Sequence, residues 1–144
     1  MISVDEALSN LFALVSKVET ETVSLRQANG RVLATEVYAT RNQPPFAASA
    51  MDGYAVKKAN VLPGTILEVI GEAAAGHRWQ GTVQEQQAVR IFTGAPLPEG
   101  TDHVVIQENV AREGEQITID DSLNDKSHVR PACADFRTGD PKSA

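Results

Sequence analysis

Acidic and hydroxyl side chains stand at the ends of apolar segments in this chain. Asp52 precedes Gly53, a pair typical of tight turns, and Thr93 precedes Gly94 directly after an apolar segment. We expect the Thr93 hydroxyl to be free to contact an anion or a hydroxyl group, and Gly94 to let a ligand approach the backbone closely. Glu108 follows the most apolar segment. Asp52, Thr93 and Glu108 would lie on one rim if the segments that carry them are neighbouring strands.

Residues 44–56, which contain Asp52, are expected to form a rigid loop. The run opens with two prolines, which fix φ and lack backbone donors, and continues with small residues that show neither helical nor strand periodicity. Its few larger apolar and aromatic side chains are expected to anchor it, and anchored loops often carry function. The alternative is a packed connector in which Asp52 caps a turn. A similar alternative, a turn that ends a strand, stays open for Thr93.

Composition argues against several kinds of site. The net charge of −6 disfavours a nucleic-acid-binding surface, which needs a basic stripe. His77, His103 and His128 lack the spacing of metal ligands, and the single Cys133 offers no thiolate cluster, so a zinc site is not expected. The sequence contains neither a Gly-rich phosphate-binding loop nor a nucleophile elbow.

The cellular compartment is expected to be reducing, because one cysteine cannot form an internal disulfide. No apolar run approaches the ~20 residues that a membrane-spanning helix needs, and no signal peptide is evident. We therefore expect a cytoplasmic protein that binds neither a membrane nor nucleic acid.

The chain begins with a pattern that predicts an amphipathic helix over residues 4–18. The helix is expected to begin with a capping box, in which Ser3 is the N-cap and the Glu6 side chain accepts a hydrogen bond from the Ser3 backbone N–H. Its apolar face is expected to pack on the chain's own core, with a dimer contact as the alternative. A strand or extended arm follows over residues 31–40. Apolar and β-branched runs then predict short strands at residues 65–70, 89–92, 103–107, 116–119 and 128–130.

The spacing of these strands, with glycine and proline between them, is typical of a small β-barrel or sandwich. We therefore predict an α+β fold that is mostly β. Residues 45–127 are expected to form the β domain. Residues 1–44 together with 128–144 are expected to form a second, smaller subdomain from the N-terminal helix and the extended arm.

Two long motifs and two shorter ones carry a family resemblance. Residues 49–56 (SAMDGYAV), which follow two prolines and a phenylalanine, resemble the signature of the molybdopterin molybdenumtransferase family, which includes the E domain of gephyrin. Residues 90–100 (RIFTGAPLPEG) look like its second motif, residues 104–108 (VVIQE) like a third and residues 129–140 (VRPACADFRTGD) like a fourth. Their order and spacing also match, so the resemblance covers nearly the whole chain.

The resemblance implies an enzyme that inserts molybdenum from molybdate into molybdopterin, starting from the adenylylated form and using Mg²⁺. Family members are elongated homodimers whose active cleft forms between the β domain of one subunit and the pterin-binding domain of the other. Asp52 and Thr93 match motif positions of that cleft. This implies that Asp52 binds the metal or organises a phosphate-bound cation, and that Thr93 holds a phosphate or molybdate oxygen. Cofactor contacts are implied for Ser49, Met51, Gly53, Tyr54, Gly94 and Glu108. A molybdopterin adenylyltransferase is the implied upstream partner.

The chain departs from the family pattern in its length and at Cys133. This chain is shorter than the family's enzymes, so we expect it to be their N-terminal portion, which supplies one wall of the cleft and dimer contacts but is inactive alone. The alternative is a stand-alone binding or scaffold module without catalysis. Cys133 stands where the fourth motif is expected to have glycine. A positive φ at that turn would cost a cysteine about 1 kcal/mol or more.

Overall fold

The computed structural model describes residues 2–16, 18–122 and 126–142. By compactness the chain divides into two units, Met1–Val37 with Lys142–Ala144, and Tyr38–Pro141. The sequence-based domain boundary, with residues 45–127 as the β domain, stays a prediction. In the described part of the chain, no helix is both long and apolar enough to cross a membrane.

The first unit contains helix α1 (Val4–Ala13) and the short 3₁₀ helix η1 (Leu25–Gln27). Ser3 is the N-cap of α1 as predicted, and its Oγ accepts a hydrogen bond from Glu6 N at 3.1 Å. The predicted end at residue 18 is wrong, because the helix ends at Ala13. No residue of α1 is buried, so tertiary packing does not extend the helix into the weaker helix formers Val15 and Ser16.

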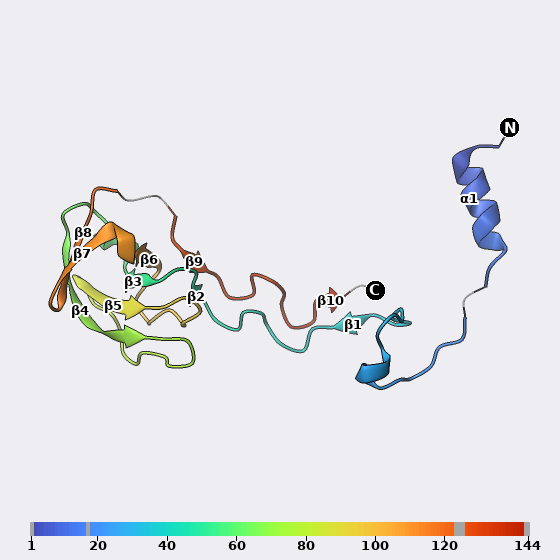
Figure 1. Cartoon of the computed structure of the whole chain (residues 1–144), viewed down its shortest axis with the longest axis horizontal. Coiled ribbons are helices and arrows are strands. Elements are labelled where there is room, and N and C mark those ends of the chain that lie inside the picture. Colours follow the sequence, from blue (N-terminus) through green and yellow to red (C-terminus); the bar gives the residue numbers. More distant parts are fainter. Residues whose placement is uncertain (1, 17, 123–125, 143–144) are drawn as a thin grey trace. The chain divides into compact units, whose positions relative to one another are not determined.

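The second unit is built on a six-stranded sheet that curls into a half-barrel (Figure 1). Its strands are β3 (Gly53–Val56), β4 (Ile66–Ala73), β5 (Gln87–Ile91), β6 (His103–Ile106), β7 (Val110–Glu113) and β8 (Gln116–Ile119), in the order β6-β3-β5-β4-β8-β7. Neighbouring strands are antiparallel except for β4 and β5, which are parallel. The predicted mostly-β class with an N-terminal helix is confirmed.

Strand β3 corrects the expectation that residues 44–56 form a loop. This stretch contains β2 (Ala48–Ser49) and then β3, which lies between β5 and β6. All four residues of β3 are buried, with Tyr54 and Val56 in one core cluster and Ala55 in the other. Because both faces of the strand are covered, its sequence shows no alternation of polar and apolar residues.

Gly53 allows β3 to pass close to β6. A Cβ atom at this position would lie 2.1 Å from the backbone oxygen of Val105, which is far inside contact distance. Gly53 pairs with Ile106 on β6 and with Ile91 on β5. Only glycine therefore lets the first residue of β3 pair on both sides without displacing the neighbouring backbone.

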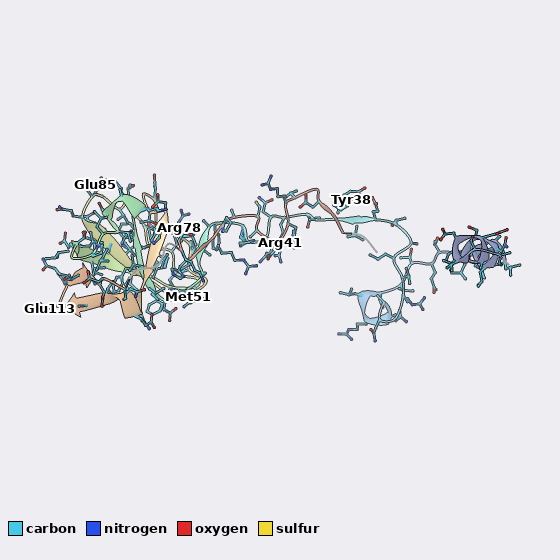
Figure 2. All side chains as sticks on the ribbon, turned by 90° about the horizontal axis from the view of Figure 1, so that it is seen from above. Tyr38, Arg41, Met51, Arg78, Glu85 and Glu113 are labelled. Carbon is cyan, nitrogen blue, oxygen red and sulfur yellow. The ribbon has the colours of Figure 1, made fainter. Side chains whose placement is uncertain are left out.

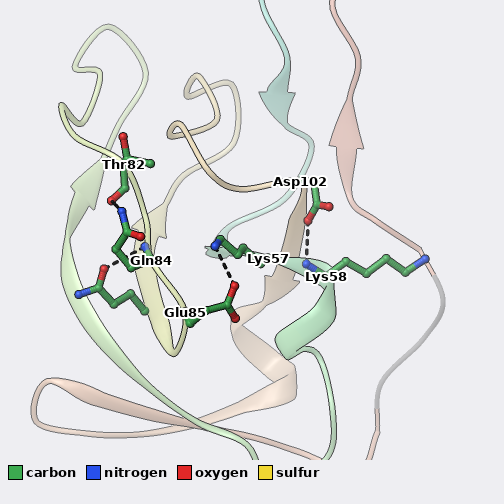
Figure 3. A network of polar contacts seen from close by, with 7 residues as sticks. Lys57, Lys58, Thr82, Gln84, Glu85 and Asp102 are labelled. Carbon is green, nitrogen blue, oxygen red and sulfur yellow. Dashed lines mark hydrogen bonds and ion pairs between the residues drawn. The ribbon is translucent and has the colours of Figure 1, made fainter.

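Polar contacts join the short 3₁₀ helix η2 (Lys58–Asn60) to the loops before β5 and β6 (Figure 3). Lys57 Nζ lies 2.8 Å from Glu85 Oε1, in the loop before β5. Asp102 Oδ1, just before β6, accepts a hydrogen bond from Lys58 N at 2.7 Å. These contacts fix the end of β3 that is remote from Asp52.

Residues 38–47 and 131–141 run side by side as two antiparallel segments, which we call the paired arm (Figures 1 and 2). At one end, β2 pairs with β9 (Val129–Arg130), and at the other, β1 (Val37–Tyr38) pairs with β10 (Pro141–Lys142). Gln43 forms a bridge with Phe136 between them. The predicted strand or arm at residues 31–40 is therefore regular only in β1, and its partner is β10.

Cys133 lies in a turn of the paired arm with φ +61°, the left-handed region that favours glycine. Its N–H donates to the carbonyl oxygen of Pro44 at 2.9 Å, which ties the turn to the opposite segment. The structure therefore confirms that this turn needs the backbone conformation for which a glycine is expected.

Replacing Cys133 by glycine should stabilise the paired arm. Asp135 N donates to Gln43 O across the arm at 2.9 Å, and its amide exchange reports local opening. We expect Cys133→Gly to slow that exchange roughly two- to fivefold, or about 0.5–1 kcal/mol, because relief of the left-handed strain outweighs the added flexibility of glycine. The matched control is Ala132→Gly at an exposed neighbour without positive φ, which should speed exchange. Faster exchange in both variants would contradict the interpretation.

Candidate functional site

The sheet topology brings the three polar side chains chosen from the sequence to one end of the sheet. Strand β3 is antiparallel to both β5 and β6, so the start of β3 lies beside the ends of those two strands. Asp52 directly precedes β3, and Thr93 follows the end of β5. Glu108 lies in the 3₁₀ helix η3 (Gln107–Asn109), which follows β6. The expected common rim therefore exists.

Asp52 and Thr93 are joined directly. Asp52 Oδ1 accepts one hydrogen bond from the backbone N–H of Thr93 at 2.8 Å and another from its hydroxyl at 2.7 Å. The expectation that the Thr93 hydroxyl is free is thus wrong, because the hydroxyl proton goes to the carboxylate. Both bonds use Oδ1, and no residue in the described ranges hydrogen-bonds to Oδ2.

The carboxyl of Asp52 is held in its ionised form. The backbone and hydroxyl hydrogen bonds from Thr93 keep the pKa of Asp52 below its ordinary value, and the positive charge of Arg90 acts in the same direction. Partial loss of hydration acts against them but is outweighed. Asp52 is therefore an anion at neutral pH, with Oδ2 available to a cation or a hydrogen-bond donor.

Ser49 and Gly94 shape the backbone around this pair. Ser49 is buried, and its Oγ donates to Met51 O at 2.5 Å, which folds the chain just before Asp52. Gly94 N donates to Ser49 O at 2.9 Å, and so links this fold to the turn after β5. Gly94 has φ +83° and open space where a Cβ would stand, so its backbone conformation requires glycine.

The other proposed cofactor contacts differ in exposure. Met51 is 42% exposed (Figure 2), whereas Tyr54 is only 3% exposed and belongs to the core. Gly53 serves the close approach of β3 to β6. Glu108 is exposed, and Gln107 links it to Asp52. Gln107 Nε2 donates to Glu108 Oε1 at 3.2 Å, and Gln107 N donates to Asp52 O at 3.1 Å.

Arg90 is part of the site but was not among the residues chosen from the sequence. Its Nη1 donates to Gly53 O at 3.3 Å and its Nη2 donates to Gln107 Oε1 at 2.6 Å. The guanidinium carbon also lies 5.1 Å from the ring centre of Tyr54 and 4.8 Å from that of Phe92. A basic residue between Val89 and Ile91 was the sequence signal that could have pointed to it.

The site offers little to a metal ion without additional ligands. No group of three or more His, Cys, Asp or Glu side chains suited to a metal ion is found within residues 2–16, 18–122 and 126–142. Asp52 presents one carboxylate oxygen, Oδ2, that accepts no hydrogen bond from the described residues. This fits a Mg²⁺ ion that keeps several waters and is held by one or two carboxylates together with substrate phosphates.

Comparison with known proteins identifies the family. A sequence model described as the MoeA N-terminal region (domain I and II) matches residues 2–142. The chain belongs to this family. The resemblance found in the sequence motifs is thereby confirmed.

Named relatives agree with this family. The chain is 40% identical over 148 residues to a molybdopterin molybdenumtransferase of Nostoc sp., covering 96% of this chain and 34% of the relative. It is 36% identical over 142 residues to a molybdopterin molybdenumtransferase of Haemophilus influenzae, covering 97% and 35%. A crystal structure of a molybdopterin biosynthesis MoeA protein from Pyrococcus horikoshii superposes with a TM-score of 0.80 and 32% identity, over 94% of this chain and 38% of that one. The chain thus spans about a third of the length of the relatives it matches.

Thr93 should control the titration of Asp52. In Thr93→Val the hydroxyl donor is lost, so we expect the pKa of Asp52 to rise toward its ordinary value, as measured by carboxyl-carbon NMR titration. Thr93→Ser keeps the hydroxyl and should titrate like the original chain. If the pKa of Asp52 is the same in all three proteins, the hydroxyl bond does not determine its ionisation.

Proposed function

We propose that this chain is the N-terminal part of an enzyme that inserts molybdenum from molybdate into molybdopterin, starting from the adenylylated form. The observation that carries the proposal is the ionised Asp52 held by Thr93, at the positions of two long family motifs. Relatives that bear the name molybdopterin molybdenumtransferase match nearly the whole chain. The proposal concerns the intact protein, because the chain spans about a third of such relatives.

Asp52 is proposed to bind Mg²⁺ through its free oxygen. A bound Mg²⁺ would draw its remaining ligands from water and from substrate phosphate oxygens, which hard cations prefer. The contribution of this chain is to keep the carboxylate ionised and in a fixed orientation. It does so with two hydrogen bonds to the same oxygen, which leave the other oxygen without a hydrogen bond from the described residues.

Thr93 is proposed to act mainly by holding Asp52. A hydroxyl has a single proton, and that of Thr93 is donated to Asp52 Oδ1. Its lone pairs remain available to a cation or a donor, whereas donation to a phosphate or molybdate oxygen would require release of Asp52. This refines the role that the family resemblance implies for the residue.

Ser49, Met51, Gly53, Tyr54, Gly94 and Glu108 are proposed to form the wall that faces the adenylylated molybdopterin, either by contact or by shaping the backbone. The intact protein is proposed to be a cytoplasmic homodimer in which another subunit completes the cleft. A molybdopterin adenylyltransferase is the proposed upstream partner, since the substrate is an adenylylated pterin.

Replacing Asp52 by Asn in the intact protein should abolish formation of the molybdenum cofactor. An amide is a poorer ligand for Mg²⁺ than a carboxylate and carries no charge, so we expect at least a roughly hundredfold loss of molybdenum insertion. The assay supplies adenylylated molybdopterin, molybdate and Mg²⁺ and measures the molybdenum bound to pterin.

The matched control is Asp102→Asn. Asp102 also accepts a backbone hydrogen bond, from Lys58 N, but lies at the other end of β3, so its replacement should leave the activity within about twofold. Near-normal activity of the Asp52→Asn protein would overturn the assignment. The 144-residue chain alone serves as a second control and should show no turnover, because it supplies only part of the cleft.

A further inference from the structure

Arg90 contacts the chain neighbour of each of the polar residues on the rim. Its Nη1 donates to the carbonyl oxygen of Gly53, the residue after Asp52. Its guanidinium lies over the ring of Phe92, the residue before Thr93. Its Nη2 donates to the side chain of Gln107, the residue before Glu108. One side chain thus joins the start of β3 with the ends of β5 and β6.

Gln107 extends this connection back to Asp52. While its side chain accepts from Arg90 at 2.6 Å, its backbone N–H donates to the carbonyl oxygen of Asp52 at 3.1 Å. Asp52 is therefore held on two sides, through Gly53 and through Gln107, by groups that Arg90 contacts. The buried ring of Tyr54 beneath the guanidinium supports it from the core.

Arginine suits this position better than lysine. The planar guanidinium donates in two directions at once and stacks on aromatic rings, whereas an ammonium is a compact charge without a fixed fork. A lysine at position 90 would keep the positive charge near Asp52 but could not reproduce both hydrogen bonds together with the contacts to the two rings.

We propose that Arg90 is a positioning residue. Its contacts hold the backbone around Asp52 in the position in which the Asp52 carboxylate accepts the two hydrogen bonds from Thr93. Its importance for molybdenum insertion rests on the function proposed above. The effect of Arg90 on the Asp52–Thr93 pair can be measured in this chain without any turnover.

Arg112 provides a matched control on the same face of the sheet. Arg90 and Arg112 both line a hollow of about 270 Å³, which Glu72 and Glu115 also line. Arg112 Nε donates to Gly114 O at 3.0 Å, within its own hairpin. Its replacement removes the same charge from the same hollow but touches none of the segments that carry the pair.

The test compares Arg90→Lys, Arg90→Gln and Arg112→Gln by two NMR measurements. Hydrogen exchange of the Thr93 backbone N–H reports its hydrogen bond to Asp52. We expect this exchange to be roughly two- to tenfold faster in both Arg90 variants and unchanged in Arg112→Gln. The Asp52 carboxyl titration should also shift toward its ordinary pKa in Arg90→Lys, which keeps the positive charge, so that the shift there reports the loosened pair and not a lost charge. The proposal is overturned if folded Arg90 variants keep the original exchange and titration, or if Arg112→Gln shifts both equally.

Gln107→Ala keeps the test decisive if the Arg90 variants do not fold. Gln107 is exposed, and this change removes one anchor of the guanidinium while it keeps the backbone bond to Asp52. Faster exchange of the Thr93 amide is expected here too, and unchanged exchange would overturn the proposal. If the full-length Arg90→Lys protein shows a loosened pair but inserts molybdenum normally, the positioning role of Arg90 is supported and the proposed function of the pair fails.

Discussion

Strand β3 passes so close to β6 that the Val105 carbonyl occupies the space where a side chain at position 53 would begin. This contact requires glycine at position 53, where β3 begins to pair with β6. Because β3 is antiparallel to both of its neighbours, its first residue lies beside the last residues of β5 and β6. Asp52 therefore lies beside the turn after β5, and its carboxylate accepts hydrogen bonds from the backbone N–H and the hydroxyl of Thr93.

The charges at this end of the sheet follow from the same geometry. Asp52 stands at the surface, where an ordinary carboxylate would be hydrated and mobile. Here two donors and a nearby guanidinium replace part of that hydration and restrict the side chain to one orientation. An anion fixed in this way loses little further entropy when a ligand binds, which is the general advantage of a preorganised site.

Much of the sheet could be predicted from the residues, because β4, β5, β6 and β8 consist largely of β-branched and apolar residues bounded by turn residues. The sequence does not reveal β3, because the strand is short, starts with glycine and is buried on both faces, so it shows no alternation of polar and apolar residues. The apolar spacing predicts a longer helix than α1, because it continues beyond Ala13 although no residue of the helix is buried.

For the site, residue type and motif position selected Asp52, Thr93 and Glu108, but not how they interact. The direct bond between Asp52 and Thr93 depends on strand pairing, which no local pattern specifies. The role of Arg90 is not evident from the sequence, because its contacts lie on β3, on η3 and at Phe92 just after β5. Contacts between residues on different strands depend on how the strands pair, which the local sequence does not specify.

The turn at Cys133 has a practical consequence for studying the paired arm. This residue is the only cysteine in the chain, and its side chain is partly exposed. A thiol-reactive fluorophore or spin label would therefore attach at a single point, within the turn that bonds to Pro44 across the arm. Such a label would report the motion of the arm without the need to remove any other thiol.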